Sequence, residues 1–249
     1  YLPGGNRGQL VAAGRILQYQ YDLAGRLVRA GEETFVHDAN GNLIERRGEQ
    51  GVTRYQYDSE DRLVRVVKPD GAEVTFGYAP TGERVWRKDA SEVTWFVTDG
   101  ANLLAELDAD LKPKATYLHG PDVDTPLRVL QGGQEYFYHT QALGSVAALT
   151  DASGKLAATY EMDAFGNLRQ QPALRNPLIF TAREWEPDLG LYYLRARYYD
   201  PALARFLTED PDWSPTAEPA DLNRYVYARN APTRYTDPWG TQAQTNPPP

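Results

Sequence analysis

The sequence contains no cysteine, one methionine and three histidines among its 249 residues. The absence of cysteine excludes disulfide bonds and thiol catalysis, and it leaves the redox compartment undetermined. The histidines, His37, His119 and His139, are scattered along the chain beside aromatic or turn residues. Because a zinc site needs grouped ligands, we expect no metal site and no cofactor.

Long hydrophobic runs and clusters of positive charge are also missing. No apolar run reaches the length of a membrane span, and no signal peptide is recognisable. The formal net charge is −8, whereas a surface that follows a nucleic-acid backbone needs positive charge, so we expect no nucleic-acid partner. The first residue is Tyr rather than Met, which predicts a fragment or a processed product.

Aromatic and turn-forming residues are abundant instead. The chain holds 17 Tyr and 5 Trp, together with 21 Gly and 18 Pro. Tyr and Trp favour strands over helices, and they bury broad rings while keeping a polar group for hydrogen bonding. Frequent Gly and Pro indicate frequent turns. The composition therefore predicts an all-β protein.

One nine-residue pattern recurs along the chain. It reads aromatic-x-aromatic-Asp-x-x-Gly-Arg/Asn-Leu, and its copies are YQYDLAGRL (19–27), FVHDANGNL (35–43), YQYDSEDRL (55–63), FGYAPTGER (76–84) and YEMDAFGNL (160–168). The first four copies follow one another at intervals of 16 to 21 residues, which fits one β-hairpin per copy with loops of variable length. A catalytic signature usually occurs once, so the recurrence indicates architecture.

Each part of the pattern has a physical role in a hairpin. Aromatics two residues apart share one face of a strand, so each copy should present two rings on the inward face. The Asp bonds backbone amides ahead of it, and the Gly takes the positive φ that closes a bulged hairpin. Asp61 replaces this Gly in the third copy, at modest cost. The returning strand should start with its Arg or Asn outward and its Leu inward.

These copies resemble the YD repeat of Rhs and teneurin-related proteins. The stretch GLYYLRARYYDP at residues 190–201, followed by ARFLTEDP at 204–211, resembles the Rhs core-associated domain. The motifs NRYVYARNAP at 223–232 and YTDPWG at 235–240 complete that domain in the family's order. The chain is therefore identified as a member of this family over nearly its whole length.

The resemblance implies an all-β fold, with YD-repeat hairpins stacked in a spiralling sheet that forms part of a shell closed by a core-associated plug. We expect hairpins over residues 1–90, a degenerate strand-rich segment over 91–177, the Rhs core-associated domain over 178–240 and a disordered or extended tail over 241–249. In bacterial members the shell encloses a C-terminal toxin. The implied partners are a toxin or cargo segment and other shell or secretion components, and the implied location is secreted or cell-surface.

The resemblance also implies candidate chemistry at the far end of the chain. In self-cleaving members, two aspartates and an arginine near the Asp-Pro-x-Gly end carry out an aspartyl-type hydrolysis. The matching positions are Arg197, Asp210 and Asp237, and cleavage is expected just after residues 237–240. Two carboxylates at close range cannot both ionise cheaply, so one keeps a proton while the other activates water. Arg197 would hold a carboxylate by paired hydrogen bonds.

Alternatives remain open for both the site and the chain. Asp-Pro steps start turns, and Arg197 lies in the run 194–198, where a solvated or plug-facing arginine needs no catalytic role. The family has Leu after Asp-Pro-x-Gly, whereas this chain has Thr241, which weakens the cleavage hypothesis. The alternative to an encapsulating shell is a teneurin-like adhesion or assembly module without catalysis, whose aromatic hairpins bind carbohydrate or a protein partner.

Overall fold

The computed structural model consists almost entirely of β-strands, and it describes residues 2, 5–12, 15–170, 174–212, 223–241 and 243–245. Sixteen strands form one antiparallel sheet, which we call the wall, and every strand pairs with its neighbours in sequence. Its strands are β1 (Gln9–Ala12), β2 (Arg15–Tyr21), β3 (Leu27–Ala30), β4 (Glu33–His37), β5 (Leu43–Gly48), β6 (Gly51–Tyr57), β7 (Leu63–Val67), β8 (Glu73–Tyr78), β9 (Arg84–Lys88), β10 (Val93–Thr98), β11 (Leu103–Leu107), β12 (Pro113–His119), β13 (Pro126–Gln131), β14 (Gln134–Thr140), β15 (Val146–Asp151) and β16 (Leu156–Thr159).

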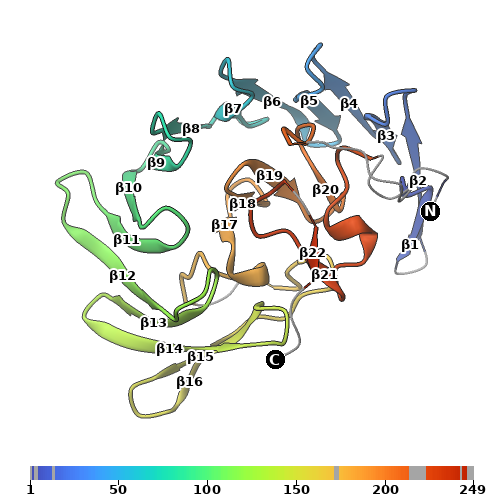
Figure 1. Ribbon diagram of the computed structural model, residues 1–249. Coiled ribbons are helices and arrows are strands. Elements are labelled where there is room, and N and C mark those ends of the chain that lie inside the picture. Colours follow the sequence, from blue (N-terminus) through green and yellow to red (C-terminus); the bar gives the residue numbers. More distant parts are fainter. Residues whose placement is uncertain are drawn as a thin grey trace.

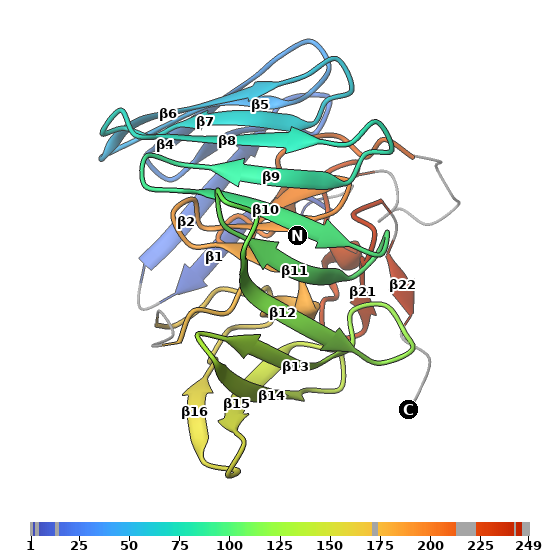
Figure 2. The same ribbon diagram turned by 90° about the vertical axis from the view of Figure 1, so that its left-hand side faces the viewer.

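The wall curves around a smaller central unit, which we call the plug and define as the described part of residues 178–240 (Figure 1). The plug contains a four-stranded sheet, the short strand β21 and two 3-10 turns: β17 (Glu184–Glu186), β18 (Leu191–Leu194), β19 (Arg197–Asp200), β20 (Arg205–Phe206), β21 (Tyr235–Thr236), η1 (Phe180–Ala182) and η3 (Ala228–Asn230). After the plug, β22 (Gln244–Thr245) pairs with β21. Figure 2 shows β4 to β13 lying side by side along the wall.

This architecture confirms the predicted all-β fold of stacked hairpins closed by a plug. Part of the predicted tail is extended, because β22 pairs with β21, whereas residues 242 and 246–249 lie outside the described residues. The division of the chain at residues 90, 177 and 240 stays a prediction. In the part of the chain that the structure describes, no helix is long and apolar enough to cross a membrane.

The repeated aspartate builds the turn in the hairpins that carry it. Asp22 Oδ1 accepts hydrogen bonds from the amides of Ala24 at 3.0 Å and Arg26 at 2.9 Å, and Gly25 has a φ of +77°. The same two bonds recur at Asp38, Asp58, Asp108, Asp151 and Asp163. A side chain that bonds amides two and four residues ahead fixes a tight turn, as the pattern predicts.

A β-bulge next to each turn decides which side chains face the plug. In the hairpin of β6 and β7, Tyr57 lies opposite Leu63 and Tyr55 lies opposite Val66, with a register shift between them. Both Leu63 and Val66 are therefore inward and almost fully buried. This inward position three residues after the leucine was not identified from the sequence. In other hairpins it is occupied by Ala30, Arg46, Arg87, Glu106 and Leu149.

The aromatic pairs line the inward face, as predicted. The first ring of each copy is at most 7% exposed, in Tyr19, Phe35, Tyr55, Phe76 and Tyr160. The second ring is half-buried and, where it is a tyrosine, can link neighbouring hairpins. Tyr57 donates its hydroxyl to the Leu43 carbonyl at 2.9 Å, and Tyr78 donates to the Leu63 carbonyl at 2.7 Å. These two bonds tie the hairpins of Tyr57 and Tyr78 to the hairpins before them.

The turn residues also connect one hairpin to the next. Asp61, which has a φ of +58° in place of the usual glycine, accepts hydrogen bonds from Asn40 at 2.9 Å and from Asn42 at 2.6 Å. Asn42 is only 1% exposed, so the prediction that this polar side chain points outward is wrong. Leu111 holds the glycine position of another turn at a φ of +61°, without a glycine signal in the sequence.

Charged side chains on the inward face pair with charges of the plug. Arg84 occupies the place of the repeat leucine, is 3% exposed, and binds Glu184 at 2.6 Å and Glu186. Its guanidinium also lies 4.4 Å from the ring of Tyr193. Arg46 binds Asp200 of the plug at 3.1 Å. Burial of these charges is tolerated because each has a partner.

Replacing Arg84 by Ala tests this connection. Removing one partner of a buried ion pair leaves an uncompensated charge, so we expect Arg84→Ala to lower the free energy of unfolding by about 3–5 kcal/mol in urea denaturation. Arg128→Ala, which breaks an exposed pair with Glu135, is the control and should cost at most about 1 kcal/mol. Equal losses in both variants would contradict the proposed anchoring role of Arg84.

Candidate functional site

Arg197 begins β19 inside the plug and is almost completely enclosed. Its side chain is 2% exposed, and the guanidinium lies 3.6 Å from the centre of the Phe206 ring. The four residues of β18 and the four of β19 are all buried, because the plug sheet is packed between two hydrophobic clusters. The alternative of a solvated arginine is therefore wrong.

The fold brings the three predicted site residues together. Arg197 Nη2 donates to Asp210 Oδ2 at 3.0 Å and to Asp237 Oδ2 at 3.4 Å. Its Nη1 donates to the Arg224 carbonyl at 2.9 Å. Asp237 is as buried as Arg197, whereas the Asp210 side chain is 14% exposed. Two carboxylates thus share one guanidinium in a largely enclosed site.

This environment favours retention of a proton by the carboxylate pair. Burial raises the pKa of Asp210 above its ordinary value, and the charge of Asp237 raises it further, while Arg197 acts in the opposite direction. Burial also lowers the pKa of Arg197, but a guanidinium stays protonated in proteins. A proton shared between the two carboxylates reduces the repulsion between two negative charges that face a single positive charge.

The same groups contact both atoms of one peptide bond. Arg197 Nε donates to the carbonyl oxygen of Gly240, and Asp237 Oδ1 accepts the amide hydrogen of Thr241 at 3.0 Å. A cation on the carbonyl oxygen can stabilise the negative charge that develops when water attacks the carbon. A carboxyl group beside the nitrogen can transfer a proton to the leaving amine.

Gly240 fits this place because it has no side chain. Its φ is +72°, and a Cβ atom there would overlap the Leu194 carbonyl oxygen and lie 3.2 Å from the backbone nitrogen of Arg197. The preceding residue, Trp239, accepts a hydrogen bond at its carbonyl from the Ala196 amide at 3.2 Å. The turn between β18 and β19 therefore supports the peptide directly before Thr241.

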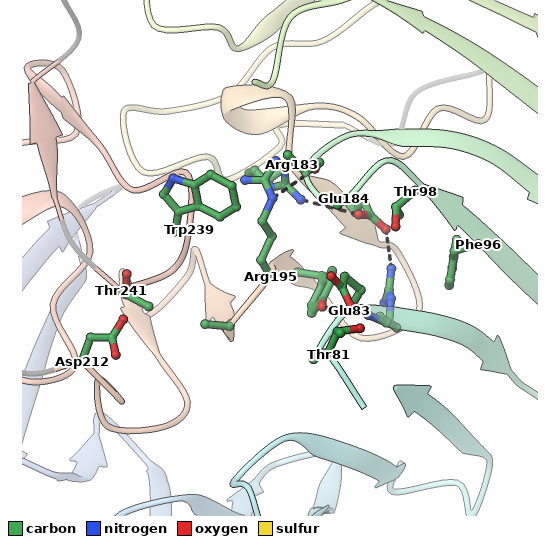
Figure 3. A pocket seen from close by; sticks show the side chains of 16 residues that line it. Thr81, Glu83, Phe96, Thr98, Arg183, Glu184, Arg195, Asp212, Trp239 and Thr241 are labelled. Carbon is green, nitrogen blue, oxygen red and sulfur yellow. Dashed lines mark hydrogen bonds and ion pairs between the residues drawn. The ribbon is translucent and has the colours of Figure 1, made fainter. Parts of the chain in front are cut away.

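A cavity of about 410 Å³ adjoins this peptide, between the plug and the wall. Figure 3 shows Trp239 beside Arg195 and Thr241 near Asp212 at its edge. Sequence reasoning missed Arg195, although it lies two residues before Arg197 in the same run. Nothing in that run indicates which arginine contacts which partner.

The histidines are separate from this site. Burial lowers the pKa of His37 to about 4, with the charge of Arg205 adding to the effect. His119 Nε2 bonds the Leu103 carbonyl at 2.8 Å, and His139 Nε2 bonds Thr150 Oγ1 at 3.0 Å. Among the described residues, no three His, Asp or Glu side chains are grouped to hold a metal ion.

Comparison with known proteins decides the family. The Teneurin YD-shell family model matches residues 1–233. The chain belongs to this family. The resemblance to Rhs and YD-repeat proteins is thereby confirmed, and it extends over the wall and most of the plug.

Individual relatives are named for different activities. The chain is 35% identical over 228 residues to the "tRNA3(Ser)-specific nuclease WapA" of Bacillus spizizenii, covering 88% of this chain and 10% of that protein. It is 28% identical over 258 residues to the "Double-stranded DNA deaminase toxin A" of Burkholderia cenocepacia, covering 88% and 18%. The chain thus spans less than a fifth of these two relatives.

A solved structure shows the same fold. The crystal structure of TcdB2-TccC3-TEV matches with a TM-score of 0.59 and 16% sequence identity, over 91% of this chain and 15% of that one. At this level of identity, the likeness concerns the fold alone.

A carboxyl titration tests the proposed proton sharing. We expect ¹³C NMR to give Asp210 a pKa above the ordinary 3.8, and Asp237→Asn to lower that pKa because a neighbouring negative charge is removed. A raised pKa in the folded state means that protonated Asp210 favours folding. This contribution is complete below the unfolded-state pKa and is lost as the pH rises through the folded-state pKa. An unchanged pKa in Asp237→Asn would contradict coupling between the two carboxyls.

Proposed function

We propose that this chain forms the closing end of a YD-repeat shell that encloses and delivers a polypeptide. The observation that carries the proposal is the curved wall whose inward face is covered by the plug (Figure 1). A one-sided sheet of this size must bury its apolar face, and here the plug's own aromatic residues occupy it. Such a plug closes the interior at the place where it docks.

The comparison with relatives supports the proposal that the cargo lies outside the segment that they share with this chain. A tRNA nuclease and a DNA deaminase toxin share sequence with this chain over less than a fifth of their own lengths. Because the two relatives differ in activity but share this segment, we infer that the segment supplies a function that the two have in common. We infer that the partner is a toxin or other cargo segment and that the protein acts after secretion or at the cell surface.

We further propose that the site hydrolyses the bond between Gly240 and Thr241. One carboxylate of the pair takes a proton from water as the water oxygen attacks the Gly240 carbonyl carbon. Arg197 stabilises the resulting oxyanion through its contact with that oxygen. As the carbon–nitrogen bond breaks, the pair returns a proton to the Thr241 nitrogen. One water is consumed, and a new carboxylate and a new amine are formed.

The adhesion alternative remains a second prediction. Most of its proposed binding rings are buried against the plug, including Tyr19, Tyr55 and Phe76. On the opposite face of the wall, Trp86 and Trp95 lie across from each other in register and are partly exposed. These two rings are the place where a sugar or partner protein would bind if the alternative held.

Protease digestion of the complete gene product tests the shell proposal. We expect the segment after Pro249 to resist a protease that cuts the denatured protein, because the wall and plug exclude the enzyme. Glu184→Gln with Glu186→Gln should make that segment sensitive by loosening the plug, whereas Glu135→Gln should not. Equal sensitivity of all forms, or a gene that encodes nothing after residue 249, would contradict encapsulation.

Mass spectrometry of the full chain tests the hydrolysis. We expect a product that ends at Gly240 in the unmutated chain, and formation at least about 100-fold slower in Asp210→Asn and in Asp237→Asn, because each removes a proton-transfer group. Asp110→Asn is the control, because Asp110 is an exposed residue in the connection between β11 and β12 of the wall. An intact chain in every form, or equal cleavage in all, would overturn the proposal.

A further inference from the structure

Arg195 is held in an unfavourable backbone conformation by its side chain's contacts. It lies in the turn between β18 and β19 with a φ of +56°, a left-handed conformation that is unfavourable for a residue with a Cβ atom. Its guanidinium donates to the Ala101 carbonyl from Nε at 3.1 Å and from Nη2 at 2.6 Å. It also donates to Asp124 Oδ1 at 2.8 Å and Oδ2 at 3.2 Å. These contacts offset the strain.

The remaining contacts of Arg195 reach the segment before Thr241. Nη1 donates to the Pro238 carbonyl, and the guanidinium lies 4.8 Å from the centre of the Trp239 ring. Figure 3 shows Arg195 extending from the plug toward Trp239 at the edge of the cavity. One side chain therefore holds both residues that precede Gly240.

The other partners of Arg195 belong to the wall. Ala101 lies between β10 and β11, and Asp124 lies between β12 and β13. The two wall connections are joined, because the Asp124 amide donates to Asn102 Oδ1 at 3.0 Å. Asp124 also binds Arg183 of the plug. Arg195 can make all its bonds only when the plug is seated against these two connections.

We propose that Arg195 is a positioning residue that makes hydrolysis of the Gly240–Thr241 bond depend on docking of the plug against the wall. The inference rests on the proposed self-cleavage. Arg197 contacts the carbonyl to be attacked, whereas Arg195 touches neither atom of that bond and acts by fixing residues 238 and 239. Without the wall's Ala101 and Asp124, the guanidinium loses four of its five hydrogen bonds, and the peptide is no longer held against Arg197.

The first test compares cleavage rates in the full chain by mass spectrometry. We expect Arg195→Met to slow formation of the product ending at Gly240 on the order of 100-fold, because small displacements of a reacting group have effects of this size. Arg195→Lys should restore part of the rate, and Asp124→Asn should slow it. Arg87→Met is the matched control: its side chain is 11% exposed against 12% for Arg195, and it also joins wall to plug. We expect it to leave the rate unchanged even if it lowers the melting temperature.

The second test measures position without requiring cleavage. In an Asp210→Asn background, hydrogen exchange of the Thr241 amide reports its bond to Asp237. We expect Arg195→Met to accelerate this exchange about tenfold or more, which corresponds to about 1.4 kcal/mol, and Arg87→Met not to do so.

The two tests separate the two proposals. If the unmutated chain stays intact, the hydrolysis proposal is overturned. If Arg195→Met nevertheless accelerates exchange of the Thr241 amide, the positioning role is still supported. Unchanged exchange together with an unchanged cleavage rate would overturn the positioning role and leave the hydrolysis standing. Equal slowing by Arg87→Met and Arg195→Met would also overturn it, because general loosening of the plug would then explain the loss.

Discussion

The bulge beside each aspartate turn is the constraint on which the rest of the structure depends. An unbulged hairpin alternates strictly, whereas one extra residue turns side chains three positions apart to the same face. Leu63 and Val66 both pack inward for this reason. Repeated from hairpin to hairpin, the bulges also increase local twist, which suits a sheet that curves around a central plug (Figure 1).

The inward face formed in this way is not purely apolar, and its charges match those of the plug. Arg84 and Arg46 stand at inward positions of the repeat and bind Glu184, Glu186 and Asp200. Buried ion pairs add little net stability, because desolvation opposes their attraction, but an unmatched one is costly. Such pairs therefore disfavour wrong placements of the plug more than they stabilise the right one. Correct placement matters, because the cavity beside the candidate site lies between plug and wall.

The candidate site combines features that stability alone does not require. Two carboxylates lie on one buried guanidinium, a glycine occupies a space that excludes any side chain, and Arg195 adopts a left-handed conformation. Strain and buried charge that persist together are typical of sites with a chemical role. Their convergence on a single peptide bond is the basis for proposing that this bond is hydrolysed.

The fold class, the hairpins and the family could be predicted from the sequence, because turn chemistry and aromatic alternation are local. An Asp and a Gly at the spacing of Asp22 and Gly25 predict a turn wherever they occur. The motif positions also identified Arg197, Asp210 and Asp237 as candidate site residues. The inward direction of Arg46 and Arg87, the burial of Asn42 and the distinct contacts of Arg195 and Arg197 could not be predicted. The first depends on a register shift, the second on the stacking of neighbouring turns, and the third on partners that lie between 13 and 94 residues away along the chain. Only the tertiary structure brings Gly240 and Thr241 to the carboxylate pair, because that meeting requires the plug to fold.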